Sequence, residues 1–396
     1  MIQISPETQL FIREHSSDDV RALALQAKKY PDIDMPTAIT QIAGRQVAAE
    51  NIPSWREIEE IWYPKHLSLE QCSSEITARY KARLLQGDSL TDLTGGFGID
   101  CSFLATGFKS ATYVERQEEL CEIAAHNFPI LNLNHINVRN EDGVAYLQSM
   151  SPVDCIFLDP ARRNEHGGKT VAISDCEPNV AELEALLLSK ANRVMIKLSP
   201  MLDLSLALKE LKHTQEVHIL SVNNECKELL ILLGQTSPAE ITIHCVNLFT
   251  KGTQEEQHFV FTREQEQRSQ CTYTDSLGDY LYEPNASLLK AGAFRSIAAA
   301  YPVRKLHPNS HLYTSDTFIE NFPGRIFRIV NQCSFNKKEV KENLADLKKA
   351  NVTVRNFPAT VAELRKRLHL TEGGDTYLFA STLNNGQKVI IRCEKV

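Results

Sequence analysis

Long apolar runs are missing from this sequence. No stretch reaches the roughly 18 apolar residues that a membrane-spanning helix needs. The first twenty residues also lack the basic start and the apolar core of a signal peptide. We therefore expect a protein that does not cross a membrane.

Closely spaced cysteines are missing too. The ten cysteines are scattered singly and no Cys-x-x-Cys occurs, which argues against a zinc ribbon, an iron–sulfur site or a redox motif. The twelve histidines show no metal-ligand spacing, so we expect no metal. Single cysteines in so large a chain are typical of reduced, mostly buried thiols, which predicts a cytoplasmic location.

Positive charge is scarce in most of the chain but not at its C-terminal end. The net charge of the whole chain is −7, yet residues 286–396 contain 18 Lys and Arg against 9 Asp and Glu. An uneven distribution of surface charges could produce this difference. The alternative is a basic C-terminal module that binds phosphates while an acidic body keeps the protein soluble.

The sequence does contain an alternation of strand-like and helix-like segments, in a length of 396 residues that suits two or three domains. Helices are predicted over residues 18–30, 36–51 and 68–87. Strands then alternate with helices, which predicts an α/β fold with a Rossmann-like parallel sheet and helices on both faces. The strand-like runs between residues 216 and 262 are interpreted as antiparallel strands that close the sheet edge.

The stretch LTDLTGGFGID, residues 90–100, follows the first strand, where doubly wound sheets bind ligands. A dinucleotide-binding loop has the pattern Gly-x-Gly-x-x-Gly, but Cys101 stands at the third glycine position. This disfavours NAD or FAD without excluding them. No Gly-Lys-Ser/Thr completes this glycine loop, since Gly98 is followed directly by Ile-Asp-Cys, so the stretch is not a P-loop.

S-adenosylmethionine is the other cofactor that suits this position. We expect Asp92 to orient the water or the amino group of its methionine part, and Gly96 and Gly98 to let the backbone approach it without a Cβ. Glu115 is placed to accept the ribose hydroxyls, although an NAD site would need an acid there too. Asp142 could accept from the adenine amino group. For each acid taken singly, a helix N-cap is an equally good interpretation.

The fourth strand ends in FLDPARR, which is similar to the Asp/Asn-Pro-Pro signature of methyltransferases that act on nucleobases. The side chain of Asp159 and the carbonyl of Pro160 would accept both hydrogens of an exocyclic amine and aim its lone pair at the methyl group. Ala161 replaces the second proline, so the match is partial. Arg162 and Arg163 could hold a phosphate or carboxylate, or could be two solvated arginines at a strand end.

Two further residues are candidates for the same site. Lys197, at the end of the next strand, either lines the pocket or extends its amine from the strand end to solvent. Cys226, in NNECKELL, would serve as a nucleophile only for carbon-5 methylation of a pyrimidine. It lacks a Ser-Cys-Asn-Pro-like context, so we favour a structural thiol.

Taken together, the motifs resemble those of a bacterial, Bacteroidetes-type family of class I S-adenosylmethionine-dependent methyltransferases with C-terminal ferredoxin-like and THUMP-like domains. The resemblance covers residues 70–396 and runs through CSSEITARYKA, DLTGGFGID, FLDPARR, KLSPMLD, NECKELL, YEPNASLLKAGAF, KLHPNSHLYTS, FPGRIF, VRNFPATVAELRKRL and GGDTYLF. It implies a helical region at 1–86, a Rossmann-like domain at 87–275, a ferredoxin-like segment at 276–322 and a THUMP-like domain at 323–396.

The residues and the resemblance together define two sets of candidate site residues. The expected cofactor-binding residues are Asp92, Thr94, Gly95, Gly96, Phe97, Gly98, Glu115, Arg116, Asp142 and Asp159. The expected catalytic residues are Asp159, Pro160 and Arg162.

We therefore expect an enzyme that uses S-adenosylmethionine to methylate a base of structured RNA, either tRNA or rRNA, because THUMP domains accompany RNA-modifying enzymes. Basic segments near Tyr301, Phe357 and Tyr377 independently favour RNA binding, although the segment 336–349 is equally well explained as an amphipathic helix with a solvated face. Three alternatives stay open: a methyltransferase of a protein or small molecule, a non-catalytic protein that binds the cofactor or RNA, and an NAD-dependent enzyme.

Overall fold

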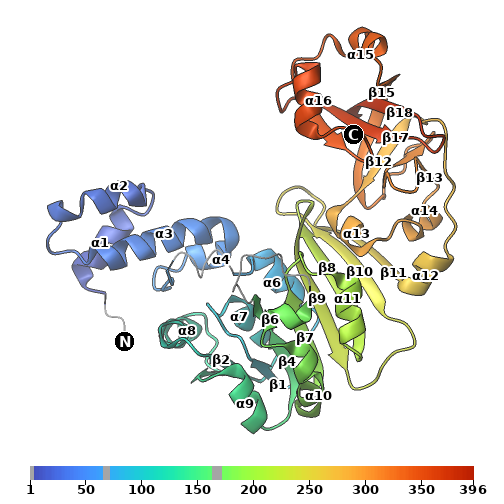
Figure 1. Cartoon of the computed structure of the whole chain (residues 1–396). Coiled ribbons are helices and arrows are strands. Elements are labelled where there is room, and N and C mark those ends of the chain that lie inside the picture. The colour runs from blue at the N-terminus through green and yellow to red at the C-terminus, as the bar shows by residue number, and fades with distance from the viewer. Residues whose placement is uncertain (1–3, 66–71, 163–171) are drawn as a thin grey trace. The chain divides into compact units, whose positions relative to one another are not determined.

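The computed structural model describes residues 4–65, 72–162 and 172–396 (Figure 1). The chain forms two compact units, one of residues 1–215 with 230–238 and the other of residues 216–229 with 239–396. The part of the chain that the structure describes contains no helix long and apolar enough to cross a membrane.

The first unit begins with short helices. They are α1 (Pro6–Glu14), α2 (Val20–Leu25), the 3₁₀ turn η1 (Ala27–Lys29), α3 (Met35–Asn51), α4 (Pro53–Arg56) and α6 (Glu75–Ala82). Asp19 and Asp34 cap α2 and α3 by accepting backbone N–H bonds of the first turn. Apolar side chains at helical spacing form a small core that includes Phe11, Leu23 and Ile42. Helices therefore occur within all three predicted ranges: α2 and η1 within 18–30, α3 across 36–51, and α6 within 68–87, of which residues 68–71 lie outside the described residues.

The parallel sheet follows the helices. Its strands in this unit are β1 (Ser89–Asp92), β2 (Ser110–Glu115), β3 (Ile136–Asn140), β4 (Val153–Leu158) and β7 (Ala191–Leu198), in the spatial order β7-β4-β1-β2-β3. The helices α7 (Ile99–Ala105), α8 (Glu118–Ile130), α9 (Gly143–Ser149) and α10 (Val180–Lys190) lie between successive strands, and α11 (Leu204–Glu210) follows β7. Asp92 is in register with Tyr113 and Phe157 of the neighbouring strands, so the carboxyl ends of β1, β2 and β4 meet at one edge.

A small hairpin extends from that edge. It consists of β5 (Ala161–Arg162) and β6 (Cys176–Glu177), with the 3₁₀ turn η2 (Ile173–Asp175) before β6. The two strands pair antiparallel, with Ala161 opposite Glu177 and Arg162 opposite Cys176, and residues 163–171 between them lie outside the described residues.

Four long strands follow: β8 (Thr214–Val222), β9 (Glu225–Gly234), β10 (Thr242–Leu248) and β11 (Glu256–Thr262). Asn223 and Asn224 join β8 to β9 with positive φ angles of 49° and 69°, the backbone of a tight two-residue hairpin turn. β11 pairs antiparallel with β10, as predicted. β10, however, pairs parallel with β8, so the expectation of purely antiparallel strands was wrong. The reason is that β9 lies along one edge of β8, whereas β10 lies along the opposite edge.

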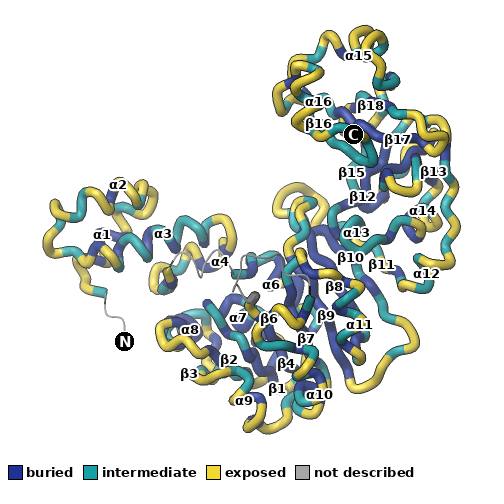
Figure 2. Tube along the Cα trace, viewed as in Figure 1, coloured by how far each residue is buried: buried dark blue, intermediate teal, exposed yellow. Residues whose placement is uncertain are grey.

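The second unit ends in a seven-stranded sheet with the order β13-β14-β12-β15-β18-β17-β16. Its strands are β12 (Tyr280–Pro284), β13 (Arg304–Lys305), β14 (Tyr313–Ser315), β15 (Gly324–Ser334), β16 (Asn351–Val354), β17 (Thr376–Thr382) and β18 (Lys388–Lys395), and its helices are α12 (Arg263–Arg268), α13 (Ala286–Ala291), α14 (Ser296–Ala300), α15 (Lys337–Leu344) and α16 (Val361–Leu368). Leu281, Phe327 and Phe379 are buried in its core. β17 and much of β18 are buried, β15 and β16 are mostly of intermediate exposure, and α15 and α16 include many exposed residues (Figure 2).

Candidate functional site

The loop after β1 has a backbone that only glycine allows at several positions. A Cβ on Gly95 would lie 2.2 Å from the ring of Tyr113. Gly96 and Gly98 have φ angles of +54° and +87°, a conformation that other residues adopt only with strain. A Cβ on Gly96 would meet nothing closer than the Thr94 carbonyl oxygen at 3.8 Å, so this glycine faces open space. The loop is therefore tightly packed against Tyr113 at Gly95 and open at Gly96.

Asp92 lies at the end of β1 with only 1% of its surface exposed. Its Oδ1 accepts a hydrogen bond from the Thr94 N–H at 3.0 Å. Its Oδ2 is buried and has no hydrogen-bond partner within the described residues. Burial, with the nearby charges of other carboxylates, raises the pKa of Asp92 to about 8. An unsatisfied buried acceptor is costly, and a ligand donor would remove that cost.

Glu115, the last residue of β2, fixes the glycine loop. Its Oε2 accepts from the Gly96 N–H at 3.0 Å and its Oε1 from the Gln117 N–H at 2.8 Å. A carboxylate oxygen has two lone pairs, so each oxygen keeps capacity for one further donor. The expected ribose-binding acid is thus brought to the loop that contains Gly96.

Thr94 links the glycine loop to the end of β4. Its hydroxyl oxygen accepts from the backbone N–H of Asp159 at 2.6 Å. The side chain of Asp159 is about one-third exposed, whereas Pro160 is buried. Of the expected catalytic residues, Asp159 and Pro160 therefore lie beside the expected cofactor loop. The backbone of Arg162 lies in β5; its side chain and Arg163 lie outside what the structure describes.

A network of buried charges surrounds Asp159. Its Oδ2 forms a short ion pair with the Nζ of Lys197, which also lies 3.5 Å from Oδ2 of Asp100 on α7. Asp100 in turn pairs with Lys81 of α6 at 2.9 Å and accepts from the hydroxyl of Ser73 at 2.7 Å. Lys81 is fully buried and its ammonium also contacts the Ser73 hydroxyl. Two cations thus face two carboxylates.

This network sets the protonation of its two acids. Burial alone would raise the pKa of Asp100, but Lys81 and Lys197 outweigh it and lower that pKa. Burial raises the pKa of Asp159, although Lys197 opposes the rise. Sequence reasoning missed Ser73, Lys81 and Asp100. The only available signal was that they lie in the motifs CSSEITARYKA and GGFGID.

Phe97 connects the loop to the N-terminal helices. Its side chain is buried and packs edge-on against Trp55, with ring centroids 5.3 Å apart. Tyr63 lies on it at 6.0 Å, and both belong to a core cluster that includes Ile52 of the α3–α4 junction. The side chain of Phe97 is therefore a packing residue, while its backbone shapes the loop.

The remaining expected cofactor residues are less central. Asp142 caps α9, with Oδ1 accepting from the N–H groups of Val144 and Ala145 at 3.0 Å each. The exposed Arg116 lies 3.8 Å from Glu177 of β6. The structure thus shows a capping role for Asp142, and a contact with adenine stays a prediction.

Cys226 has the character of a structural thiol. Burial raises its pKa to about 11, so it stays protonated and is a poor nucleophile at neutral pH. The NNECKELL motif has a clear structural use, because its two asparagines adopt the positive φ angles of the β8–β9 turn. This favours the structural interpretation over carbon-5 chemistry.

A protein from Porphyromonas gingivalis W83, classed as a methyltransferase, has a solved structure similar to this chain over its whole length. The two chains are 34% identical, each is covered to 100%, and the TM-score is 0.87. The chain belongs to this family of methyltransferases. The model of a ferredoxin-like domain matches residues 280–323, and that of a THUMP-like domain matches residues 324–395. These findings confirm the family resemblance seen in the sequence.

More distant solved structures match only part of this methyltransferase. An rRNA methylase from Streptococcus thermophilus is 15% identical with a TM-score of 0.29, covering 40% of this chain and 93% of its own. A protein from Streptococcus mutans, classed as a methyltransferase and in complex with S-adenosylhomocysteine, is 12% identical with a TM-score of 0.30, covering 40% and 96%. Likeness at this level carries no argument about function. No curated protein matches the chain.

Proposed function

We propose that this methyltransferase uses S-adenosylmethionine to methylate an amino or ring nitrogen of a base in structured RNA, either tRNA or rRNA. The observation that carries the cofactor assignment is the buried Oδ2 of Asp92, which has no partner within the described residues and lies in the loop of the open-faced Gly96. The acceptor assignment rests on Asp159, and the RNA assignment rests on the C-terminal domains.

The residues present fit this cofactor. Oδ2 of Asp92 offers an acceptor for its cationic amino group, directly or through water, and that positive charge would favour the ionised carboxylate over the protonated form that burial favours. Gly96 leaves space where a side chain would intrude. Glu115 offers one further lone pair on each oxygen for the ribose hydroxyls. Asp142 would accept from the adenine amino group. When bound, the cofactor supplies an electrophilic methyl group.

Asp159 and Pro160 position the acceptor. An ionised Asp159 accepts one hydrogen of an exocyclic amine, and the Pro160 carbonyl accepts the other, which orients the nitrogen lone pair. Lys197 favours the ionised form of Asp159 through its ion pair and fixes one carboxylate oxygen, Oδ2. Oδ1 is then the oxygen available to the amine. Catalysis by this arrangement requires no covalent nucleophile.

The basic C-terminal region supports an RNA substrate. Residues 324–395 match a THUMP-like domain, and such domains accompany RNA-modifying enzymes. Exposed cations lie on its two helices, among them Lys338 and Lys341 of α15 and Lys366 of α16. Leu364 turns inward from α16, so its cationic side is available to phosphates.

The test is transfer of radiolabel from S-adenosylmethionine to total RNA from a strain that lacks the gene. We expect label in one RNA size class with the wild-type protein, and at least about 100-fold less with Asp159→Ala. Calorimetry should show cofactor affinity within about threefold of wild type for that variant, because the proposed contact of Asp159 is with the acceptor amine and the other expected cofactor-binding residues are unchanged. Asp203→Ala, which removes an exposed cap of α11, is the matched control and should retain transfer.

Each failure has a distinct meaning. Full transfer by Asp159→Ala would remove Asp159 from the mechanism. Cofactor binding without label in RNA would contradict the RNA assignment and favour a protein or small-molecule acceptor. Binding of a nicotinamide cofactor in place of S-adenosylmethionine would overturn the cofactor assignment.

A further inference from the structure

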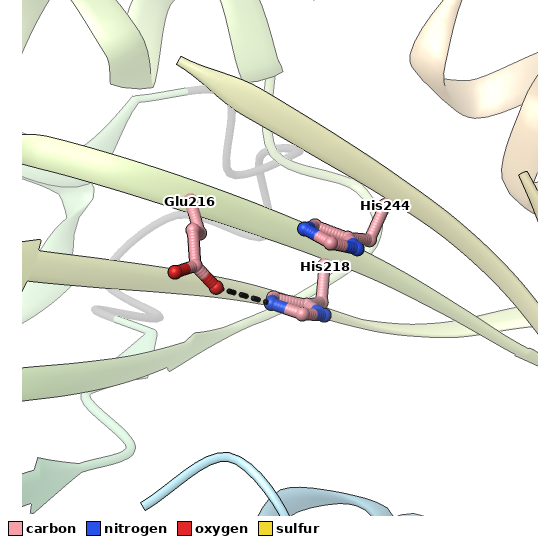
Figure 3. Close-up of side chains that lie close together, drawn as sticks. All are labelled: Glu216, His218 and His244. Atoms are coloured by element: carbon pink, nitrogen blue, oxygen red, sulfur yellow. Dashed lines mark hydrogen bonds and ion pairs between the residues drawn. The ribbon is translucent and has the colours of Figure 1, made fainter. Parts of the chain in front are cut away.

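Two neighbouring strands of the second unit present a cluster of metal-ligating side chains. Glu216 and His218 lie on β8, and His244 lies on β10 (Figure 3). His244 is directly in register with His218 on these parallel strands, so the two imidazoles lie one over the other. Glu216 is two residues before His218 and therefore shares its face of the sheet.

The geometry of the cluster is compact. The two imidazole rings stack with centroids 4.2 Å apart and planes only 6° from parallel. Nε2 of His218 lies 3.2 Å from a carboxylate oxygen of Glu216. One ligand atom from each of the three residues lies within 4.8 Å of the others. Bonds of about 2.0–2.2 Å to one ion place ligand atoms roughly 3.3–3.5 Å apart. The two imidazole rings must therefore turn out of their parallel stack for both to bind the ion through nitrogen atoms in their ring planes.

A third imidazole orients His244. Nδ1 of His244 lies 3.1 Å from Nε2 of His258 on β11, which leaves its Nε2 on the side of the cluster. Metal-bound histidines commonly use their other ring nitrogen in this way.

We propose that Glu216, His218 and His244 form a binding site for one divalent transition-metal ion of the zinc class, with His258 as the positioning residue of His244. Two imidazole nitrogens and one carboxylate oxygen are the donor set that zinc accepts, with a solvent molecule as the fourth ligand. Glu216 is about one-third exposed, which gives the ion a route from solvent. The ligands of this site differ from every residue assigned to methyl transfer, so the proposal does not depend on the proposed function.

The sequence could not show this site because His218 and His244 are far apart in the chain, outside the short spacings of metal motifs. Only the parallel pairing of β8 with β10 brings them into register. A simpler interpretation is a hydrogen bond between His218 and Glu216 with the ring of His244 stacked on that of His218. That arrangement would show no specific affinity for metal, so a binding measurement separates the two.

The experiment is calorimetric titration of the full-length protein with zinc chloride after treatment with a chelator. We expect one ion per chain with a dissociation constant below about 1 μM. Glu216→Gln and His244→Asn should each weaken binding at least about 100-fold, and His258→Asn about tenfold, because it removes only an orienting partner. His213→Asn is the matched control, since His213 forms a similar 3.2 Å pair with Glu184 but without a second imidazole in that pair. It should bind as wild type does.

Cobalt(II) provides a second readout on the same proteins. We expect visible absorption bands of a nitrogen- and oxygen-ligated ion in the wild type and their loss in Glu216→Gln. Unfolding midpoints of the metal-free variants within a few degrees of wild type would show that each variant is folded. No stoichiometric binding by the wild type would overturn the proposal. Binding that is equal in all variants, or cobalt spectra typical of thiolate ligands, would overturn it as well.

Discussion

Asp92 contains a carboxyl group that burial keeps protonated far above its usual range, with a pKa of about 8. In the unfolded chain the pKa of the same group is about 3.9. Between these values the folded state binds a proton that the unfolded state has lost, so stability falls as pH rises. The contribution of protonated Asp92 to the stability of the fold is fully present below about pH 4 and is lost by about pH 8.

This difference predicts a pH-dependent effect of Asp92→Asn. The free energy of unfolding can be measured with urea at a series of pH values. In the wild type it should fall by up to about 1.4 kcal/mol per pH unit in that window because of Asp92, and the variant should lack this contribution. The variant should therefore gain stability over wild type as pH rises. Asp203→Asn, at an exposed helix cap, should keep the wild-type slope. Parallel slopes for wild type and Asp92→Asn would contradict the assignment.

Gly96 allows a test of the open face of the loop. Gly96→Ala and Gly292→Ala both place a Cβ at a positive φ, +54° and +75°, with nearest neighbours at 3.8 and 3.9 Å. Each should therefore lose about 1–2 kcal/mol of stability from backbone strain. Only Gly96→Ala should also weaken binding of S-adenosylmethionine, by at least about tenfold. Equal cofactor affinity in the two variants, measured by calorimetry, would exclude Gly96 from the cofactor site.

At the scale of elements, the packing of Trp55 on Phe97 ties the short helix α4 to the glycine loop. Trp55→Ala should cost about 3–5 kcal/mol in unfolding free energy, as for other buried aromatic truncations. It should also weaken cofactor binding, because Phe97 in the glycine loop loses the aromatic ring that it packs against. Trp62 stacks instead on His126 at 3.6 Å and is only partly buried, so Trp62→Ala serves as the comparison. If both variants bound the cofactor equally, packing behind Phe97 would not shape the loop.

The same elements show what sequence reasoning could and could not reach. The strands β1, β2 and β4 and the acids at their ends follow from local patterns, since period, caps and glycines act over a few residues. The ion pair between Lys197 and Asp159 and the contact of Lys81 with Asp100 do not. Both contacts join segments that are far apart in the chain. In addition, a lysine in a predicted helix is expected to be exposed to solvent unless its burial is known. The parallel pairing of β10 was missed for the same reason.

At the scale of the whole molecule, the excess of positive charge near the C-terminus predicts a salt-dependent affinity for RNA. Lys341→Glu with Lys366→Glu should weaken RNA binding about tenfold or more at low salt and flatten its dependence on salt concentration. Lys28→Glu with Lys29→Glu alters the net charge equally in the N-terminal helices and should have a much smaller effect. Filter binding across a salt series would measure both. Equal losses in the two pairs would indicate a general charge effect and no RNA-binding face.

Charge reversal is a better test here than deletion. β12 lies in the range that matches a ferredoxin-like domain and β15 in the range that matches a THUMP-like domain, yet the two strands pair over five positions. Removal of residues 324–396 would expose the edge of β12 and the apolar face around Leu281. Loss of activity after such a deletion would therefore report damage to the remaining sheet as well as loss of RNA contacts.

The pairing of Asp100 with Lys81 and Ser73 has a practical consequence for any attempt to isolate the enzyme's chemistry in a smaller piece. A fragment cut where the alternation of strands and helices begins, at residue 87, would contain the acids of every parallel strand. It would also carry Asp100 with Lys197 as its remaining cation, and Lys197 would then be shared between two carboxylates. The shortest fragment fit for grafting or directed evolution therefore begins upstream of Ser73. The alternation of strands and helices does not indicate this starting point.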